Sequence, residues 1–233
     1  MVIAVAGGVG IAAGCMAWAV RGRSSTVFGP SVWHGPRTGR RLALTFDDGP
    51  SESTPQVLGT LERYGARATF FQCGRNVRRL PEVARAVACA GHEIGNHGDS
   101  HARLWLQPPS FIENEIARAQ EAITRASGRQ PALFRPPYGV RWFGLARAQK
   151  RFGLMGVMWT AIGSDWRLSA ASIARKLLRA ASPGAIFCLH DGRELAPRPD
   201  IRNTIDALGR LLPELCARGY EFTTVSELIC PTT

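Results

Sequence analysis

Two adjacent carboxylates close an apolar run early in the chain, in the stretch LALTFDDGP at residues 42–50. Asp47 and Asp48 repel one another unless solvent, a cationic side chain or a metal ion compensates their charge. Gly49 and Pro50 then turn the chain at once, so both carboxylates are expected at the end of a strand. Such a pair can divide the work of hydrolysis: one acid holds a cation, and the other acts as a base beside it.

A pair of histidines supplies the ligands that this interpretation needs. His97 and His101, in the stretch NHGDSH, are four positions apart, a spacing that brings both imidazoles to one side of a helix and that a tight loop can also achieve. Two histidines and one carboxylate leave coordination positions free for water and substrate. Asp47 or Asp48 could supply the carboxylate, and the spacing does not decide between them. A further histidine in LHDG, at residues 189–192, strengthens the prediction of a metal centre.

Short apolar runs alternate with amphipathic stretches along most of the chain. The expected strands are 42–46, 68–72, 92–96, 133–135, 154–160, 185–189 and 221–224. The expected helices are 54–64, 81–90, 110–127, 143–152, 170–181 and 201–218. This alternation predicts an α/β fold with parallel strands, as a barrel or as an open doubly wound sheet. The polar motifs follow strand ends, and in a barrel those loops share the face where active sites form.

Five motifs, in this order, make the chain similar to a known family. They are TFDDGP at 45–50, HGDSH at 97–101, RPPYG at 135–139, SDW at 164–166 and LHDG at 189–192. From about Arg40 to Leu228 the chain resembles the polysaccharide deacetylases with a NodB homology domain, carbohydrate esterase family 4. The resemblance implies a NodB-like distorted (β/α)7 barrel, preceded here by a hydrophobic N-terminal helix. It also implies metal-dependent removal of an N-acetyl group from an amino-sugar polymer or oligomer, such as peptidoglycan, a chitin-like chain or an exopolysaccharide.

The resemblance also implies a role for each motif residue. Asp48, His97 and His101 would hold a divalent metal, zinc in the first place, with cobalt or nickel as alternatives. Asp47 would be the general base and His190 the general acid. The supporting residues would be Arg135 paired with Asp47, Asp165 orienting His190 and raising its pKa, the backbone N–H of Tyr138 as an oxyanion donor, and Pro137, Trp166 and Leu189 around the substrate pocket.

Two positions depart from the family's pattern. Gly98 follows His97 where the family usually has Ser or Thr, which removes a hydrogen bond from the loop but no metal ligand. Residues 161–163 lack the acidic residue that the family usually carries upstream of Asp165. Substrate contacts on that side of the site are therefore expected to differ.

The first 23 residues are expected to form a membrane anchor or a signal-like segment. They carry no charge before Arg21, and about 20 apolar residues are enough to cross a bilayer. Residues 24–40, rich in Ser, Gly and Pro, are expected to link this segment to a deacetylase domain at 41–229. We expect a protein held at the membrane or exported to the cell envelope. The side of the membrane stays open, because Arg21 and Arg23 favour a cytoplasmic domain whereas an envelope substrate requires the opposite.

Composition limits the class of protein. The chain has 233 residues, 45% of them hydrophobic, which is enough for one sizeable domain. Its net charge of +11 comes from scattered arginines without interleaved aromatic residues, so we expect a basic surface facing solvent or an anionic envelope and no nucleic-acid partner. Most of the six cysteines are expected to be small buried residues. A disulfide between Cys216 and Cys230 could form if the domain is exported. We expect a monomer that binds an N-acetylated glycan.

Two other functions stay open. A deformylase or deacylase of a lipid-linked amino sugar would account for both the N-terminal segment and the basic charge. A non-catalytic glycan-binding module would keep the barrel without the chemistry, but Asp47 and His190 are both present, which disfavours it.

Overall fold

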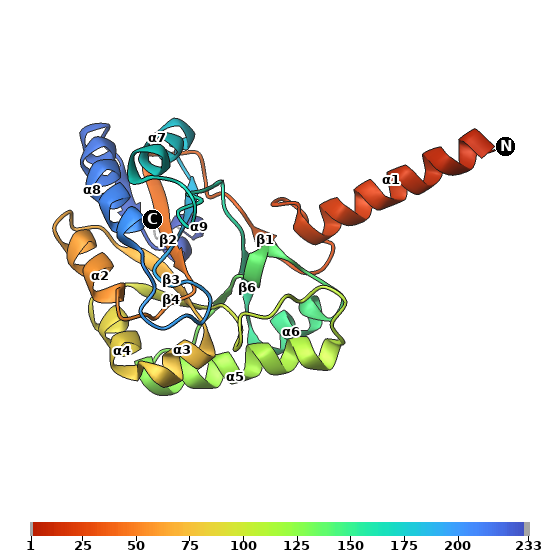
Figure 1. Ribbon diagram of the computed structural model, residues 1–233, viewed down its shortest axis with the longest axis horizontal. Helices are drawn as coiled ribbons and strands as arrows, with labels where there is room; N and C mark the ends of the chain where they lie inside the picture. Colours follow the sequence, from red (N-terminus) through yellow and green to blue (C-terminus); the bar gives the residue numbers. More distant parts are fainter. Residues whose placement is uncertain (1, 231–233) are drawn as a thin grey trace.

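The N-terminal segment forms the helix α1 (Val2–Arg21), which projects away from the rest of the chain (Figure 1). The computed structural model describes residues 2–230, with side chains from residue 12 onward. Residues 1–11 of the predicted anchor therefore lie outside the described side chains. No helix in the part of the chain so described is long and apolar enough to cross a membrane.

The strands form one curved parallel sheet, with helices on its outer side (Figure 1). Its strand order is β1-β6-β5-β4-β3-β2-β8-β7, and β9 pairs with β2. The strands are β1 (Ser31–Val32), β2 (Arg41–Asp47), β3 (Ala68–Gln72), β4 (Glu93–Asn96), β5 (Leu133–Phe134), β6 (Met155–Val157), β7 (Ala161–Ile162), β8 (Ile186–His190) and β9 (Glu221–Thr223). Every pairing between them is parallel, which confirms the predicted α/β fold in the form of an open half-barrel.

The helices follow the strands as the alternation of the sequence predicts. They are α2 (Thr54–Glu62), α3 (Gly74–Arg79), α4 (Pro81–Cys89), α5 (Pro109–Ser127), η1 (Pro137–Gly139), α6 (Leu145–Phe152), α7 (Ala170–Ala180), α8 (Arg202–Ala217) and α9 (Val225–Ile229). The six predicted helices are all present. The sequence did not reveal α3, η1, α9, β1 or β7, because each is too short to show a hydrophobic period.

The central strand β2 separates the core from the site. Successive side chains of a strand point to opposite faces of its sheet. Leu42, Leu44 and Phe46 are fully buried and pack in the core beneath the helices. Thr45 and Asp47 face the inside of the half-barrel, where both accept hydrogen bonds from the same arginine. Each fully buried leucine stabilises the fold by about 1.5–3 kcal/mol, so the apolar face of β2 holds the polar face in place.

Parts of the segment at residues 24–40, the predicted linker, pack against the domain. Strand β1 pairs with β6, and Phe28 is buried. Arg141 donates through Nη1 to the carbonyl oxygen of Ser25, 2.5 Å away. Serine, glycine and proline are typical of linkers, but here an added edge strand and a buried arginine fix the segment.

The cysteines differ from their prediction. Cys73 and Cys188 are buried, whereas the other four are exposed, so the expectation that most are buried is wrong. All six are free, and no disulfide joins Cys216 to Cys230. Cys89 and Cys216 lie at the carboxyl-terminal ends of outer helices, where a small apolar side chain can face solvent.

Candidate active site

Three predicted ligands converge where β2 and β4 end. Nε2 of His101 lies 3.0 Å from Oδ1 of Asp48, and Nε2 of His97 lies 3.4 Å from the same oxygen. One donor atom from each residue lies within 4.8 Å of the others, and all three side chains are buried. Asp48 and His101 have positive φ angles of 73° and 55°, which are uncommon outside glycine. The backbone is therefore bent at the two points where it aims these donors inward.

This donor set fits a divalent cation. Oδ1 of Asp48 is buried and has no hydrogen-bond partner, although two imidazole nitrogens face it. Burial raises the pKa of Asp48, but the neighbouring imidazoles of His101 and His97 outweigh it and hold the pKa well below its ordinary value. The carboxylate oxygen of Asp48 is ionised and buried beside two imidazole nitrogens, and no cation compensates its charge in the described part of the chain. A metal that accepts nitrogen and oxygen ligands, such as zinc, would supply one.

Contacts behind the ligands fix their orientation. Nδ1 of His97 lies 2.7 Å from the carbonyl oxygen of Arg135, and since a carbonyl can only accept, Nδ1 carries the proton. Nε2 of His97 is therefore free to donate its electron pair to a metal. Oδ2 of Asp48 accepts a hydrogen bond from the backbone N–H of Glu194, at 2.8 Å. Both ligands are thus held before any metal binds.

The loop that carries the two histidines is stiffened by a glutamate. Glu115 on α5 accepts hydrogen bonds from the backbone N–H groups of Asp99 and Ser100, at 3.1 and 2.8 Å, and from the Ser100 hydroxyl. Gly98 has a φ of 76°, a conformation that glycine adopts without strain. The hydrogen bond that Gly98 cannot make is therefore replaced by contacts from a neighbouring helix.

Asp47 is paired with a buried arginine. Nη1 of Arg135 donates to Oδ1 of Asp47 at 2.7 Å and to the hydroxyl of Thr45 at 2.6 Å. Its Nε and Nη2 donate to the carbonyl oxygens of Val157 and Met158, each at 3.1 Å. Arg135 is fully buried, so these bonds compensate a charge that water cannot reach. The predicted pair between Arg135 and Asp47 is therefore formed.

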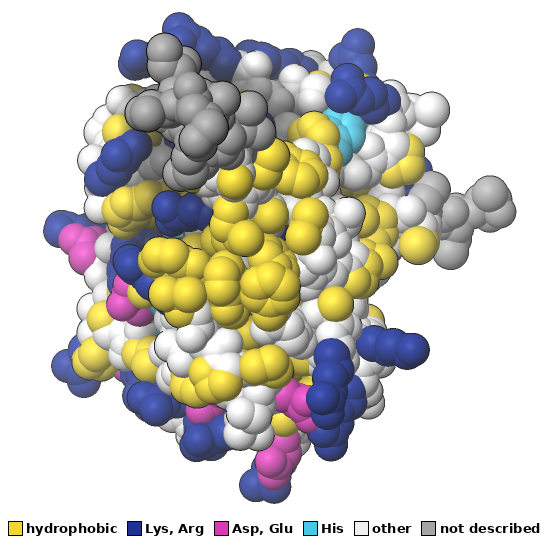
Figure 2. All heavy atoms as spheres, turned by 90° about the vertical axis from the view of Figure 1, so that its right-hand side faces the viewer, with side chains coloured by type: hydrophobic (Ala, Val, Ile, Leu, Met, Phe, Trp, Pro, Cys, Tyr) yellow, Lys and Arg dark blue, Asp and Glu magenta, His cyan; other side chains and the backbone are white. Residues whose placement is uncertain are grey.

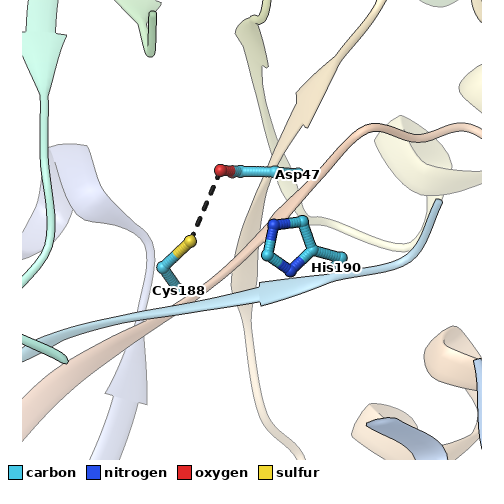
Figure 3. A group of neighbouring side chains, drawn as sticks. All are labelled: Asp47, Cys188 and His190. Atoms are coloured by element: carbon cyan, nitrogen blue, oxygen red, sulfur yellow. Dashed lines mark hydrogen bonds between the residues drawn. The ribbon is translucent and has the colours of Figure 1, made fainter. Parts of the chain in front are cut away.

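The other oxygen of Asp47 faces β8. Figure 3 shows Cys188 and His190 on β8 beside Asp47, whose register partner in the sheet is His190. Sγ of Cys188 donates to Oδ2 of Asp47 at 3.4 Å. Burial raises the pKa of the Cys188 thiol well above its ordinary value, and the charge of Asp47 adds to this. The thiol is therefore a neutral donor to Asp47.

His190 is held in a protonated state by an aspartate. Its Nδ1 lies 2.8 Å from Oδ1 of Asp165, whose Oδ2 accepts from the His190 backbone N–H and from the Thr204 hydroxyl. Burial lowers the pKa of His190, but the charge of Asp165 outweighs it and raises the pKa to about 9. Since Nδ1 is occupied, Nε2 is the nitrogen left to act on a substrate. The predicted orienting role of Asp165 matches this geometry.

One cavity of about 580 Å³ joins these groups. It is lined by both acids of the DDGP motif, the three histidines His97, His101 and His190, and Tyr138. Trp166 stands at its edge, 51% exposed, with its ring perpendicular to that of His190 at a centroid distance of 5.2 Å. The space is large enough for a sugar unit, because ligand pockets start at about 300 Å³.

Two residues predicted to line the pocket do not. Leu189 is fully buried in the core beneath the helices, because it alternates along β8 with Cys188 and His190, which line the cavity. Pro137 is buried in the turn η1, and the cavity is lined instead by the next residues, Tyr138 and Gly139. Tyr138 has a φ of 57°, which turns the chain at this point.

Several cavity residues have no motif that would reveal them. Glu194, four positions after His190, lines the cavity and accepts a hydrogen bond from the Tyr138 hydroxyl at 2.7 Å. Burial and the nearby Glu194 raise the pKa of Tyr138 to about 12, so its hydroxyl stays neutral. Arg21, the last residue of α1, also lines the cavity. Only the position of Glu194 just after LHDG could have suggested it, and nothing in the sequence indicates Arg21.

Comparison with known proteins agrees with this fold and site. Residues 34–157 match the sequence profile described as polysaccharide deacetylase. The chain is 37% identical over 202 residues to a peptidoglycan-N-acetylglucosamine deacetylase of Bacillus cereus, which covers 85% of this chain and 92% of that protein. The chain belongs to the polysaccharide deacetylase family.

Two more relatives and a solved structure extend the comparison. A chitooligosaccharide deacetylase of a Bradyrhizobium species is 35% identical over 198 residues, covering 81% of this chain and 90% of that protein. A peptidoglycan-N-acetylglucosamine deacetylase of Listeria monocytogenes is 36% identical over 194 residues, which are 82% of this chain but only 39% of that longer relative. The crystal structure of the peptidoglycan N-acetylglucosamine deacetylase Bc1960 superposes with a TM-score of 0.81 at 32% identity, covering 87% of this chain and 94% of that one.

Proposed function

We propose that this protein is a metal-dependent N-deacetylase that removes the acetyl group from an amino sugar within a glycan. One observation carries the proposal: Asp48, His97 and His101, which could hold a metal ion, line the same cavity as Asp47 and His190. The names of its relatives, which act on peptidoglycan or chitooligosaccharides, support the substrate class.

The proposed ligands are Asp48, His97 and His101. They would hold a divalent metal, which we propose is zinc, and the chemistry it would supply is a water of lowered pKa, about 7, and polarisation of the amide carbonyl of the substrate. Because the Nδ1 proton of His97 is directed to the carbonyl oxygen of Arg135 and the pKa of Asp48 is lowered, Nε2 of His97 and the carboxylate of Asp48 are the groups that would face such a metal.

Asp47 is the proposed general base. It lies next to Asp48 in the chain, yet its carboxylate is directed to Arg135 and Cys188 rather than to the histidines. Arg135 orients the carboxylate of Asp47, which we propose takes a proton from the attacking water. A positioned base of this kind contributes about 10²–10⁴-fold to the rate.

His190 is the proposed general acid. An amine leaves an amide only when its nitrogen is protonated, and the imidazole of His190 carries a proton because Asp165 faces its Nδ1. The proton on Nε2 is the one to be given to the departing amine. Asp47 and His190 thus lie side by side on neighbouring strands, one as the proposed base and the other as the proposed acid.

The remaining residues position the substrate. We propose that the backbone N–H of Tyr138 contributes to the oxyanion site and that Trp166, exposed at the edge of the cavity, packs against the sugar ring. A single oxyanion donor contributes about 10²–10³-fold to turnover.

A second candidate function is hydrolysis of a formyl or acyl group on a lipid-linked amino sugar. The observation that favours it is Arg21, which lines the cavity from the end of α1. We propose that residues 1–23 hold a monomer at the membrane or in the cell envelope, since both classes of substrate lie there. Protease digestion of intact and lysed spheroplasts determines on which side the domain lies.

The test is a substrate panel on the purified, metal-free chain reloaded with zinc, cobalt or nickel. We expect acetate release from N-acetylglucosamine oligomers or peptidoglycan fragments, its loss with a chelator and its return with the metal. Release from a lipid-linked amino sugar alone would favour the second candidate. Glycan binding without release from any member of the panel would indicate a binding module and contradict the proposed chemistry.

A further inference from the structure

A cluster of aromatic and aliphatic side chains is exposed outside the cavity. The aromatic patch consists of Val27, Trp105, Leu106 and Phe143, which are 54–66% exposed, with Phe28 and Trp142 packed among them. Its rings are continuous: Trp142 lies 6.4 Å from Trp105 and 5.0 Å from Phe143, and Phe28 lies 4.9 Å from Phe143. In a soluble monomer, a contiguous apolar surface of this kind is uncommon without a binding partner.

The patch lies at the base of α1. Ala19 and Val20, near the end of that helix, pack in one cluster with Phe28 and Val140, and Trp142 packs against this cluster. Figure 2 shows the side of the molecule from which α1 projects, and hydrophobic side chains gather on it with arginine or lysine side chains around them. In the described part of the chain, the exposed large hydrophobic side chains are Met16 and Trp18 of α1, the four of the patch, and Trp166 of the cavity.

The backbone of the patch is bent to expose an apolar side chain. Leu106 has a φ of 60°, a left-handed conformation that costs energy for a bulky residue, and its side chain is 66% exposed. Such strain persists only where the surrounding structure enforces it, and it is concentrated at functional positions. The turn presents Trp105 and Leu106 outward together.

We propose that the aromatic patch rests on an anionic phospholipid bilayer. Tryptophan and phenylalanine beside aliphatic side chains suit the boundary between headgroups and acyl chains, where indole rings are enriched. Arg103, two positions before Trp105, and Arg21, which follows Val20 of the same apolar cluster, supply positive charge beside the patch for anionic headgroups. The uncharged sequence that precedes Arg21 ends at this same face.

Two other occupants fit the patch less well. A sugar chain stacks on flat, parallel aromatic faces, whereas Trp105 and Trp142 meet at 85°, Trp142 and Phe143 at 80°, and Phe28 and Phe143 at 78°. A second copy of the chain would need about 20–30 residues on each side for a stable interface, far more than the patch provides.

The contact would place the mouth of the cavity at the membrane surface. The guanidinium of Arg103 stacks on the ring of Tyr138 at 4.6 Å, and Tyr138 and Arg21 both line the cavity. The patch and the cavity are therefore neighbours on the molecule. This membrane contact does not depend on which acyl group is hydrolysed, so it can be tested apart from the proposed deacetylation.

The test uses tryptophan fluorescence of the full chain in vesicles of phosphatidylcholine and phosphatidylglycerol with bromine on the acyl chains. Bromine quenches only those indoles that reach the acyl boundary. We expect Trp105→Phe to lose part of the quenching seen for the wild type. Trp166→Phe is the matched control, because Trp166 is 51% exposed but lines the cavity, and it should leave the quenching of the other indoles in place.

Two further measurements complete the test. Phe143→Ser should also reduce the quenching of tryptophan fluorescence. Brominated phosphatidylcholine alone should quench Trp105 less than the anionic mixture does. The proposal is overturned if Trp105→Phe is quenched like the wild type. It is also overturned if a soluble N-acetylglucosamine oligomer perturbs Trp105 without lipid, or if light scattering shows a dimer that Phe143→Ser abolishes, since these results assign the patch to glycan or to a second copy.

Discussion

At the scale of single residues, the two adjacent carboxylates are distinguished by what surrounds them. Asp48 faces two imidazoles, and Asp47 faces Arg135 and a neutral thiol. Asp48 takes up a left-handed backbone conformation directly after the strand, so its side chain points to different neighbours from that of Asp47. The geometry brings Asp48, rather than Asp47, beside the two histidines, and it therefore supports Asp48 as the proposed metal ligand, a choice that spacing alone leaves open.

Replacing the base tests this division. Asp47→Asn should lower turnover by about 10²–10⁴-fold while the metal content stays near that of the wild type, because the donor set is untouched. Turnover on an N-acetylglucosamine oligomer and metal content by mass spectrometry are the measurements. Asp48→Asn is the control and should lose metal as well as activity. Full activity of Asp47→Asn would exclude Asp47 as the base.

Removing the partner of the acid should move the pH profile. Asp165 helps to raise the pKa of His190 to about 9, and His190 would need its proton to act as the proposed acid. In Asp165→Asn the pKa should fall towards its ordinary value of about 6.5, so the alkaline decline of kcat moves to lower pH. Thr204→Val keeps the carboxylate and should move the profile less. An unchanged alkaline limb in Asp165→Asn would show that another group is the acid.

At the scale of elements, one arginine connects three strands. Arg135 follows β5 and donates to Asp47 at the end of β2 and to Val157 at the end of β6. Arg135→Met leaves the Asp47 carboxylate buried without its partner, which should lower the free energy of unfolding by about 3–5 kcal/mol. Urea unfolding measures this loss. Arg125→Met, which breaks an exposed pair with Glu121, should cost about 0.3–0.5 kcal/mol, and an equal effect of both variants would contradict the structural role.

The sequence predicted the long elements well and the short ones poorly. Residues 68–72 and the helix that ends near Ser127 show clear patterns, because a buried strand and three or more helical turns leave several apolar positions in register. Strand β1 has two residues and lies among prolines and glycines, so only its pairing with β6 identifies it. Leu189 shows a related limit: the motif LHDG gives its position but not the face of β8 on which it lies.

At the scale of the whole molecule, the cavity residues that belong to a motif could be predicted from the sequence. Those that reach the cavity only through tertiary contacts could not. The five motifs located both acids and all three histidines of the cavity. Glu194, Cys188 and Arg21 reach the same cavity through loop closure, strand alternation and the docking of α1, which depend on contacts between distant segments. Such contacts leave no local signal in one sequence.

Metal binding should be coupled to the stability of the whole domain. The donors come from two loops after β2 and β4, so a bound cation joins segments about fifty residues apart, from Asp48 to His97 and His101. A ligand present at 100 times its dissociation constant stabilises a fold by about 2.7 kcal/mol. Removing the metal with a chelator should therefore lower Tm by about 2–4 °C for each kcal/mol of stabilisation that metal binding had provided. The circular dichroism spectrum should be retained, since the apolar core does not contain the site.

The same measurement on two histidine variants separates a specific site from general effects of metal. His97→Gln should lose the metal-dependent rise in Tm, because it removes one of the three donors and the hydrogen bond to Arg135. His34→Gln removes a histidine of the segment at residues 24–40, outside the cavity, and should keep the full rise. If both variants respond to zinc as the wild type does, the cation is not held by the donors described, and the assignment of Asp48, His97 and His101 fails even if the glycan is still hydrolysed.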